Sequence, residues 1–119
     1  MLITIFEKNL MWSTRLQRSI KSLGHEAEII DKPSAQYKPG DAAIINLASE
    51  DFDLEVLVNQ LKSEGIYVIA HAGHKEEECL DAGKKLNCDY IVTNRYLAEK
   101  IDKVIDSIPT HSSKILNNE

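Results

Sequence analysis

A short apolar run that ends on an amide constrains the fold of this 119-residue chain more than any other feature. The run is Asp41-Ala42-Ala43-Ile44-Ile45-Asn46-Leu47, with Pro39-Gly40 before it and Ser49-Glu50-Asp51 after it. Four consecutive apolar residues between turn formers indicate a strand that is buried on both faces. In an open parallel sheet, ligands bind just outside the carboxyl ends of the strands, where Asn46 is expected to lie. An amide is a poor nucleophile and a weaker oxygen ligand than a carboxylate, which limits the chemistry at this position.

Strands and helices alternate along the rest of the chain. Apolar runs predict the strands, and apolar residues at helical spacing predict the helices. The predicted strands are 2–6, 26–30, 42–47, 66–70 and 90–92. The predicted helices are 10–23, a helix that starts near Ser49 and ends at Gly65, 75–86 and 95–108. This alternation predicts a three-layer, doubly wound α/β fold, with helices on both faces of a five-stranded parallel sheet.

The connection between the second and third strands is unusually short. Residues 31–40 contain Pro33, Pro39 and Gly40 and few helix formers in a row. A parallel crossover normally needs about a dozen residues or more. We therefore expect the helix of this second crossover to be short or missing. We also expect one domain over residues 1–109, followed by a polar and flexible tail over residues 110–119.

The charge balance argues against two classes of partner. The chain has 19 acidic and 14 basic residues and a net charge of −5. An acidic chain without a basic cluster is not expected to bind nucleic acid or an anionic membrane. No apolar run is long enough to span a bilayer, and residues 1–7 have no basic segment typical of a signal peptide. We therefore expect a soluble cytoplasmic protein.

The two cysteines, Cys79 and Cys88, show no metal-binding or redox spacing. Two reduced thiols are the expected state in a cytoplasmic protein. A metal pair and a redox switch are the alternatives.

Two segments of the chain resemble the receiver domain of two-component response regulators. Residues 41–47 are similar to the family's D-hydrophobic-D-L strand. Residues 82–94 are similar to its helix followed by a G-A-D-x-Y-hydrophobic strand. The resemblance covers roughly residues 2–108 and implies a CheY-like, flavodoxin-like sheet with strand order 2-1-3-4-5.

The same resemblance implies a phosphorylation site that this chain has lost. Receivers transfer a phosphoryl group to an aspartate with the help of Mg²⁺, two acids after strand one, a Ser or Thr after strand four and a Lys after strand five. The corresponding positions are Phe6-Glu7, Asn46, His71 and Asn94. The resemblance therefore implies a degenerate pseudo-receiver with no catalytic residue, no bound metal and no cofactor, and we predict that it is not an enzyme.

Plain structural roles remain open for several of these side chains. Asn46 is expected to satisfy backbone groups in the loop after its strand. Glu7 is either a solvated loop residue or a surviving metal ligand. His71 is either a hydrogen-bonded structural histidine or a switch. Tyr90 occupies the aromatic position that receivers use for signalling, and it is equally consistent with a half-buried strand residue.

The resemblance implies a function through protein binding. We expect a single-domain, phosphorylation-independent module for signalling or protein interaction, with another protein as its partner. Receivers usually bind through the face formed by their fourth helix, fifth strand and fifth helix. In this chain that face is expected to contain Tyr90, Arg95, Tyr96, Glu99 and Lys103. Formation of a homodimer through the same face is also consistent with the sequence.

Two other functions are compatible with single motifs. The first is binding of a small molecule or nucleotide in the crevice at the strand ends, with Asn46, His71 and His74 as polar contacts. The segment His71-Ala72-Gly73-His74 also matches the HxGH motif of nucleotidylyltransferases. In that family, however, the motif follows the first strand, whereas here it follows the fourth, so the enzyme hypothesis is disfavoured. A metal site at the two histidines lacks a third ligand nearby in the sequence.

Overall fold

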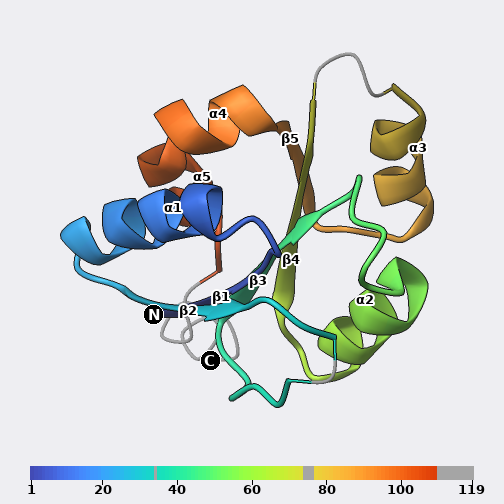
Figure 1. The fold of residues 1–119 in the computed structure, drawn as a ribbon, viewed down its shortest axis with the longest axis horizontal. Helices are drawn as coiled ribbons and strands as arrows, with labels where there is room; N and C mark the ends of the chain where they lie inside the picture. The colour runs from blue at the N-terminus through green and yellow to red at the C-terminus, as the bar shows by residue number, and fades with distance from the viewer. Residues whose placement is uncertain (34, 74–76, 110–119) are drawn as a thin grey trace, which may run out of the picture.

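The computed structural model describes residues 1–33, 35–73 and 77–109 of the chain (Figure 1). Within them, a parallel sheet has the strand order β2-β1-β3-β4-β5. Its strands are β1 (Leu2–Phe6), β2 (Glu26–Ile30), β3 (Ala42–Asn46), β4 (Tyr67–Ala72) and β5 (Tyr90–Thr93). The helices are α1 (Leu10–Ser22), α2 (Leu54–Ser63), α3 (Glu77–Lys85), α4 (Asn94–Glu99) and α5 (Ile101–Asp106). The predicted three-layer fold and strand order are confirmed.

Helices cover both faces of the sheet and form two separate cores. In Figure 1, α1, α4 and α5 lie on one face, and α2 and α3 lie on the other. The central strand β3 is buried from Ala42 to Ile45, and its side chains alternate between the two cores. The predicted doubly buried strand is therefore confirmed. Of the buried polar side chains on the sheet, Thr4 lies in the middle of a strand, whereas Glu7 and His71 lie at the carboxyl ends of their strands.

The second crossover contains no helix in its described residues, as predicted. The loop between β2 and β3 covers the sheet with a single aromatic side chain, because the ring of Tyr37 packs edge-on against Phe6 at 5.2 Å. The loop then returns to the sheet at Gly40. A Cβ atom there would lie 2.7 Å from the backbone oxygen of Leu2, so only glycine fits this close approach.

Two helix boundaries differ from the prediction. The helix predicted to start near Ser49 begins after Asp53, whose side chain accepts a hydrogen bond from the backbone N–H of Val56. The Ser49 N–H instead donates to the backbone oxygen of Asn46 in the turn after β3. The single helix predicted over residues 95–108 is two helices, separated at Lys100, where the backbone leaves the helical region at φ −122° and ψ 37°.

Two further predictions have different outcomes. No described helix is long and apolar enough to cross a membrane. The tail predicted over residues 110–119 lies outside the described residues, so its flexibility stays a prediction.

Thr4 provides a test of the packing in the middle of the sheet. It is only 2% exposed, and its hydroxyl has no hydrogen-bond partner among the described residues. Thr4→Val keeps the branched shape and removes a buried polar group that has no partner, so we expect the free energy of unfolding to rise by about 1 kcal/mol. Urea unfolding followed by circular dichroism measures the change.

The matched control is Thr14→Val at an exposed position of α1. We expect this substitution to change the stability by less than about 0.5 kcal/mol. A loss of stability in Thr4→Val would show that the hydroxyl has a partner and would contradict this account of the core.

Candidate functional site

Polar side chains form a row along the edge of the sheet where the strands end. Asn46 ends β3 and is paired in register with His71 of β4. Glu7 follows β1 directly, and Asn94 follows Thr93, the last residue of β5. The sheet therefore brings together four of the five predicted positions, because the carboxyl ends of parallel strands meet at one edge.

The fifth predicted position, Phe6, does not belong to this row. Its side chain points to the opposite face of the sheet, where it packs edge-on against Tyr37 and Phe52, with a ring-centroid distance of 5.9 Å to Phe52. Phe6 is therefore a core residue. At the end of β1, Glu7 is left as the single acid of the predicted pair.

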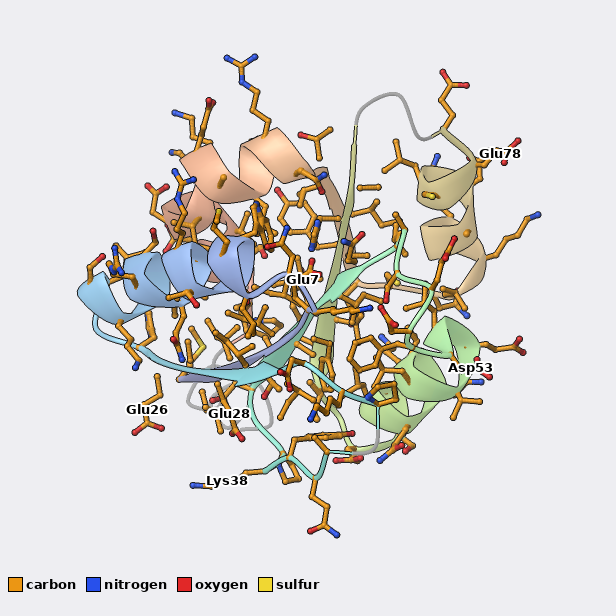
Figure 2. All side chains as sticks on the ribbon, in the orientation of Figure 1. Glu7, Glu26, Glu28, Lys38, Asp53 and Glu78 are labelled. Carbon is orange, nitrogen blue, oxygen red and sulfur yellow. The ribbon has the colours of Figure 1, made fainter. Side chains whose placement is uncertain are left out.

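A hydrogen bond joins Glu7 to Asn46 across the ends of β1 and β3. The side-chain N–H of Asn46 donates to Glu7 Oε1 at 3.0 Å, and the backbone N–H of Asn9 donates to Glu7 Oε2 at 3.1 Å. Glu7 is only 8% exposed and lies near the centre of the view in Figure 2, whereas Glu26, Lys38 and Glu78 lie at its periphery. Glu7 is therefore not a solvated loop residue, and each of its two carboxylate oxygens accepts a hydrogen bond.

The side-chain oxygen of Asn46 also forms a hydrogen bond. It accepts from the backbone N–H of Ala48 at 2.9 Å. Reversing the amide would place oxygen against the Glu7 carboxylate and N–H against N–H, so the network fixes its orientation. The expected role of Asn46 in satisfying the loop backbone is confirmed, and its bond to Glu7 is an addition that the sequence did not reveal.

This arrangement does not fit the Mg²⁺ of a receiver. Magnesium requires oxygen ligands in near-octahedral geometry, usually including one or two carboxylates. Here both oxygens of Glu7 accept hydrogen bonds, and Asn46 presents an N–H donor to that carboxylate. The described residues also contain no cluster of three or more acidic, histidine or cysteine side chains suited to a metal. The donor set therefore disfavours a divalent cation at this position.

His71 is a buried, hydrogen-bonded side chain. It is 2% exposed, and its Nδ1 lies 2.6 Å from the side-chain oxygen of Asn94, a distance at which the ring N–H donates to the amide. Trp12 of α1 stacks on the imidazole, with ring centroids 4.7 Å apart and planes at 27°. Trp12 belongs to the helix predicted over residues 10–23. Its contact with His71 depends on the tertiary structure and has no local sequence signal.

An open polar crevice lies above the ends of β1 and β3. Its volume is about 510 Å³. The residues that line it are Glu7, Lys8, Asn9, Asn46, Ala48, Ser49, Glu50 and Asp51. Lys8 and Asp51 form an exposed ion pair at 3.5 Å. His71 does not line this crevice, in contrast to the ligand-binding hypothesis, and His74 lies outside the described residues.

The residues of the predicted interaction face lie on and beside the edge strand β5. The structure brings the phenols of Tyr90 and Tyr96 together. Their hydrogen bond is the main cause that raises the pKa of Tyr90. Tyr90 is half-buried on the side of the sheet covered by α4 and α5. Arg95 and Glu99 form an exposed ion pair at 3.1 Å, and Lys103 is exposed on α5.

Cys88 is a half-buried thiol that forms no disulfide. Burial is the main cause that raises the pKa of Cys88 to about 11, and the negative charge of Asp89 adds to it against the opposing effect of Lys62. Little thiolate exists at neutral pH under these conditions, so Cys88 is a poor nucleophile and a poor metal ligand.

Comparison with known proteins shows the fold and gives no sequence relative. No family model and no curated protein matches the chain. Among solved structures, the receiver domain of the TMAO respiratory system response regulator TorR is 18% identical, with a TM-score of 0.73 and coverage of 91% of this chain and 98% of that one. Chemotaxis protein CheY4 of Vibrio cholerae is 12% identical, with the same TM-score and the same coverage of both chains.

A third similar structure is a response regulator of Burkholderia pseudomallei that was solved with a phosphorylated aspartic acid, a calcium ion and citrate. It is 9% identical, with a TM-score of 0.69, and the match covers 98% of this chain and 71% of that one. The TM-scores and coverages of these three structures show that the chain has the CheY-like receiver fold predicted from the sequence.

The contact between His71 and Asn94 can be tested by mutation. Asn94→Ala removes the acceptor of a buried imidazole N–H, so we expect the free energy of unfolding to fall by about 1–2 kcal/mol. Asn94→Asp keeps an oxygen acceptor at the start of α4 and is the matched control. We expect its free energy of unfolding to lie within about 0.5 kcal/mol of that of the original chain. Urea unfolding measures both variants. Equal stability of Asn94→Ala and the original chain would contradict a structural role for this pair.

Proposed function

We propose that this chain is a receiver-like interaction module that binds another protein and acts without phosphorylation of an aspartate. The receiver fold and the similar structures of response regulators support the general class. The loss of phosphorylation and the binding of a partner are our inferences from the residues at the strand ends.

The hydrogen-bonded pair of Glu7 and Asn46 is the observation that most supports this proposal. Phosphorylation needs a carboxylate nucleophile, whereas Asn46 has an amide whose two ends bind Glu7 and Ala48. The remaining carboxylate, Glu7, is held by two N–H donors. The strand ends therefore resemble a fixed polar contact more than an empty phosphorylation site.

The electrostatics of the crevice also oppose phosphoryl transfer. Catalysis of this reaction depends on positive charge placed around the transferring group. The crevice contains the carboxylates Glu7, Glu50 and Asp51, and its one ammonium group, Lys8, is paired with Asp51. Asn94, at the position of the receiver lysine, binds His71. Without cationic assistance, we infer that the chain is not a phosphotransfer enzyme.

The surface around β5 and α4 has the chemistry of a binding face. Tyrosine and arginine are enriched at the centres of protein interfaces, and Tyr90, Tyr96 and Arg95 lie together here. Glu99 and Lys103 supply charged groups on the adjoining helical surface. We propose this face as a contact site for another protein or, at high concentration, for a second copy of the chain.

The crevice favours one second candidate function, the binding of a small polar ligand. Its volume of about 510 Å³ is in the range of ligand sites. Its excess of carboxylates argues against nucleotides and favours neutral or cationic molecules. A thermal-shift screen with nucleotides, flavins, amines and divalent metals tests this candidate, and Glu7→Gln is the variant expected to lose any such response.

Phosphorylation can be tested directly. We expect incubation with acetyl phosphate and Mg²⁺ to add no phosphoryl group to the chain, because position 46 has no nucleophile. Intact-mass spectrometry measures the product. The receiver domain of TorR, treated in parallel, is the control that the acetyl phosphate is active. A stoichiometric adduct would contradict the proposal, above all one that persists in Asn46→Ala and maps to another acid.

Asn46→Asp extends this test to the metal. The substitution places a second carboxylate within hydrogen-bond distance of Glu7, so we expect a loss of stability of about 1–3 kcal/mol at neutral pH. Mg²⁺ is expected to reverse part of that loss, because it neutralises the repulsion, while leaving the melting temperature of the original chain unchanged. An equal effect of Mg²⁺ on both proteins would contradict the role assigned to the amide.

A further inference from the structure

Helix α1 is a basic surface on an acidic protein. Residues 10–22 include Arg15, Arg18 and Lys21 and no acidic residue, although the chain as a whole has a net charge of −5. All three cationic side chains are exposed, and none forms an ion pair with a described residue. Free cations on one helix attract a negatively charged surface from outside the chain.

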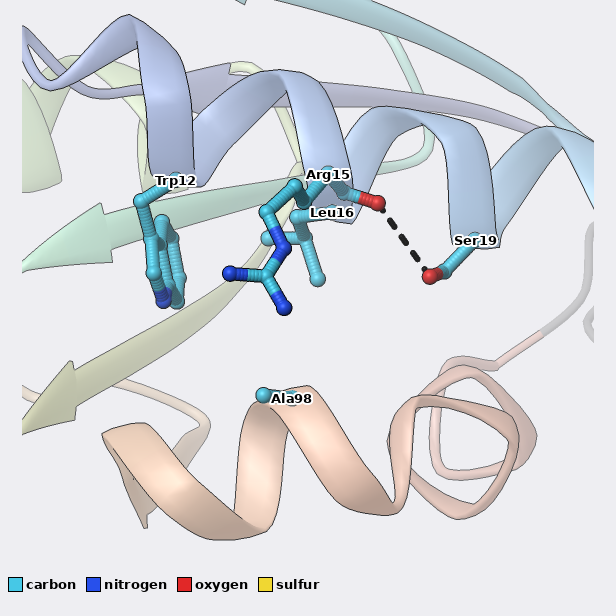
Figure 3. A pocket seen from close by; sticks show the side chains of 5 residues that line it. All are labelled: Trp12, Arg15, Leu16, Ser19 and Ala98. Atoms are coloured by element: carbon cyan, nitrogen blue, oxygen red, sulfur yellow. Dashed lines mark hydrogen bonds between the residues drawn. The ribbon is translucent and has the colours of Figure 1, made fainter.

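A groove lies beside these cations, between α1 and α4. Trp12, Leu16 and Ala98 supply most of its apolar surface, and Arg15 and Ser19 border it (Figure 3). The side chains from α1 point across the gap toward Ala98, the small residue that leaves the groove open. Its volume is about 170 Å³. An apolar cavity of about 150 Å³ holds a benzene-sized group, so one large apolar side chain fits here.

Exposed apolar residues lie at the start of α1. Leu10 is 51% exposed and Met11 is 79% exposed. Met11, Arg15 and Arg18 are spaced i, i+4 and i+7 and therefore lie along one side of the helix. Met11, Arg15 and Arg18 thus lie beside the groove lined by Trp12 and Leu16, whereas Leu10 lies on the other side of the helix. Tryptophan and arginine are the residue types that dominate the energy of protein interfaces.

We propose that the α1–α4 groove binds an acidic amphipathic helix of a partner protein. One aromatic or branched side chain of that helix fills the groove against Trp12 and Ala98. Its glutamate and aspartate side chains face Arg15 and Arg18. This is the helix-in-groove mode of recognition, in which apolar anchors give affinity and charges select the partner. The inference rests on the proposed function as a protein-binding module and adds the chemistry of the partner.

A membrane and a second copy of the chain fit these observations less well. The net charge of −5 repels an anionic bilayer, although α1 itself is basic. A second copy would bring the same cations of α1 together in a symmetric contact, which is repulsive. An acidic partner segment satisfies both the charge of α1 and the size of the groove.

The probe is a phage library of helical peptides whose surface positions vary among Glu, Asp, Lys and Arg and whose anchor positions vary among Ala, Leu, Met and Phe. Selection on the full chain is expected to recover acidic peptides with a large apolar anchor. Trp12 is the only tryptophan of the chain, so its fluorescence reports binding at the groove. We expect Arg15→Glu and Ala98→Leu each to weaken binding by about tenfold or more.

Lys84→Glu, on α3 across the sheet, is the charge-matched control and is expected to leave the affinity within about twofold. Recovery of basic or neutral peptides, or of no peptide, would overturn the groove proposal. Peptides that bind equally to Arg15→Glu but are lost with Tyr96→Ala would overturn it while supporting the proposed binding face at β5. Binding to equimolar phosphatidylserine and phosphatidylcholine vesicles in place of peptides would overturn it in favour of a lipid surface.

Discussion

The hydrogen bond between the Asn46 amide and the Glu7 carboxylate is the interaction on which the candidate site depends. It joins the ends of β1 and β3, and it gives the nearly buried carboxylate of Glu7 a hydrogen-bond donor. A buried carboxylate without such donors is costly. Glu7 also accepts from the backbone of Asn9, the residue whose side chain caps α1, so the same carboxylate ties the sheet to the start of that helix.

A second polar pair extends this arrangement along the edge of the sheet. His71 contacts Asn94 at the start of α4 and stacks on Trp12 of α1. His71 and Asn94, two of the positions that the receiver resemblance predicts for the phosphorylation site, thus join the sheet to α1 and α4. A domain built in this way keeps the receiver fold, and its outer surfaces at β5 and at α1 are the ones that we propose for recognition.

Local sequence patterns predicted the elements of this fold better than their ends. Doubly buried strands follow from unbroken apolar runs, and the missing crossover helix follows from Pro33, Pro39 and Gly40. The break at Lys100 was missed because the apolar spacing continues through it, with Leu97 and Ile101 both buried. The positions of the site followed from the receiver resemblance. Their partners depend on contacts between distant segments, such as Glu7 with Asn46, which no local pattern encodes.

We propose that the amide of Asn46 occupies, through its bond to Glu7, the place where a receiver holds its metal and phosphoacceptor. Titration of the ¹⁵N-labelled chain with Mg²⁺, followed by NMR, tests this most directly through the side-chain NH₂ of Asn46 and the backbone amide of Ala48. The account predicts that neither signal shifts in a saturable way. A saturable shift of both signals, with release of the Asn46 NH₂ from its hydrogen bond, would contradict it.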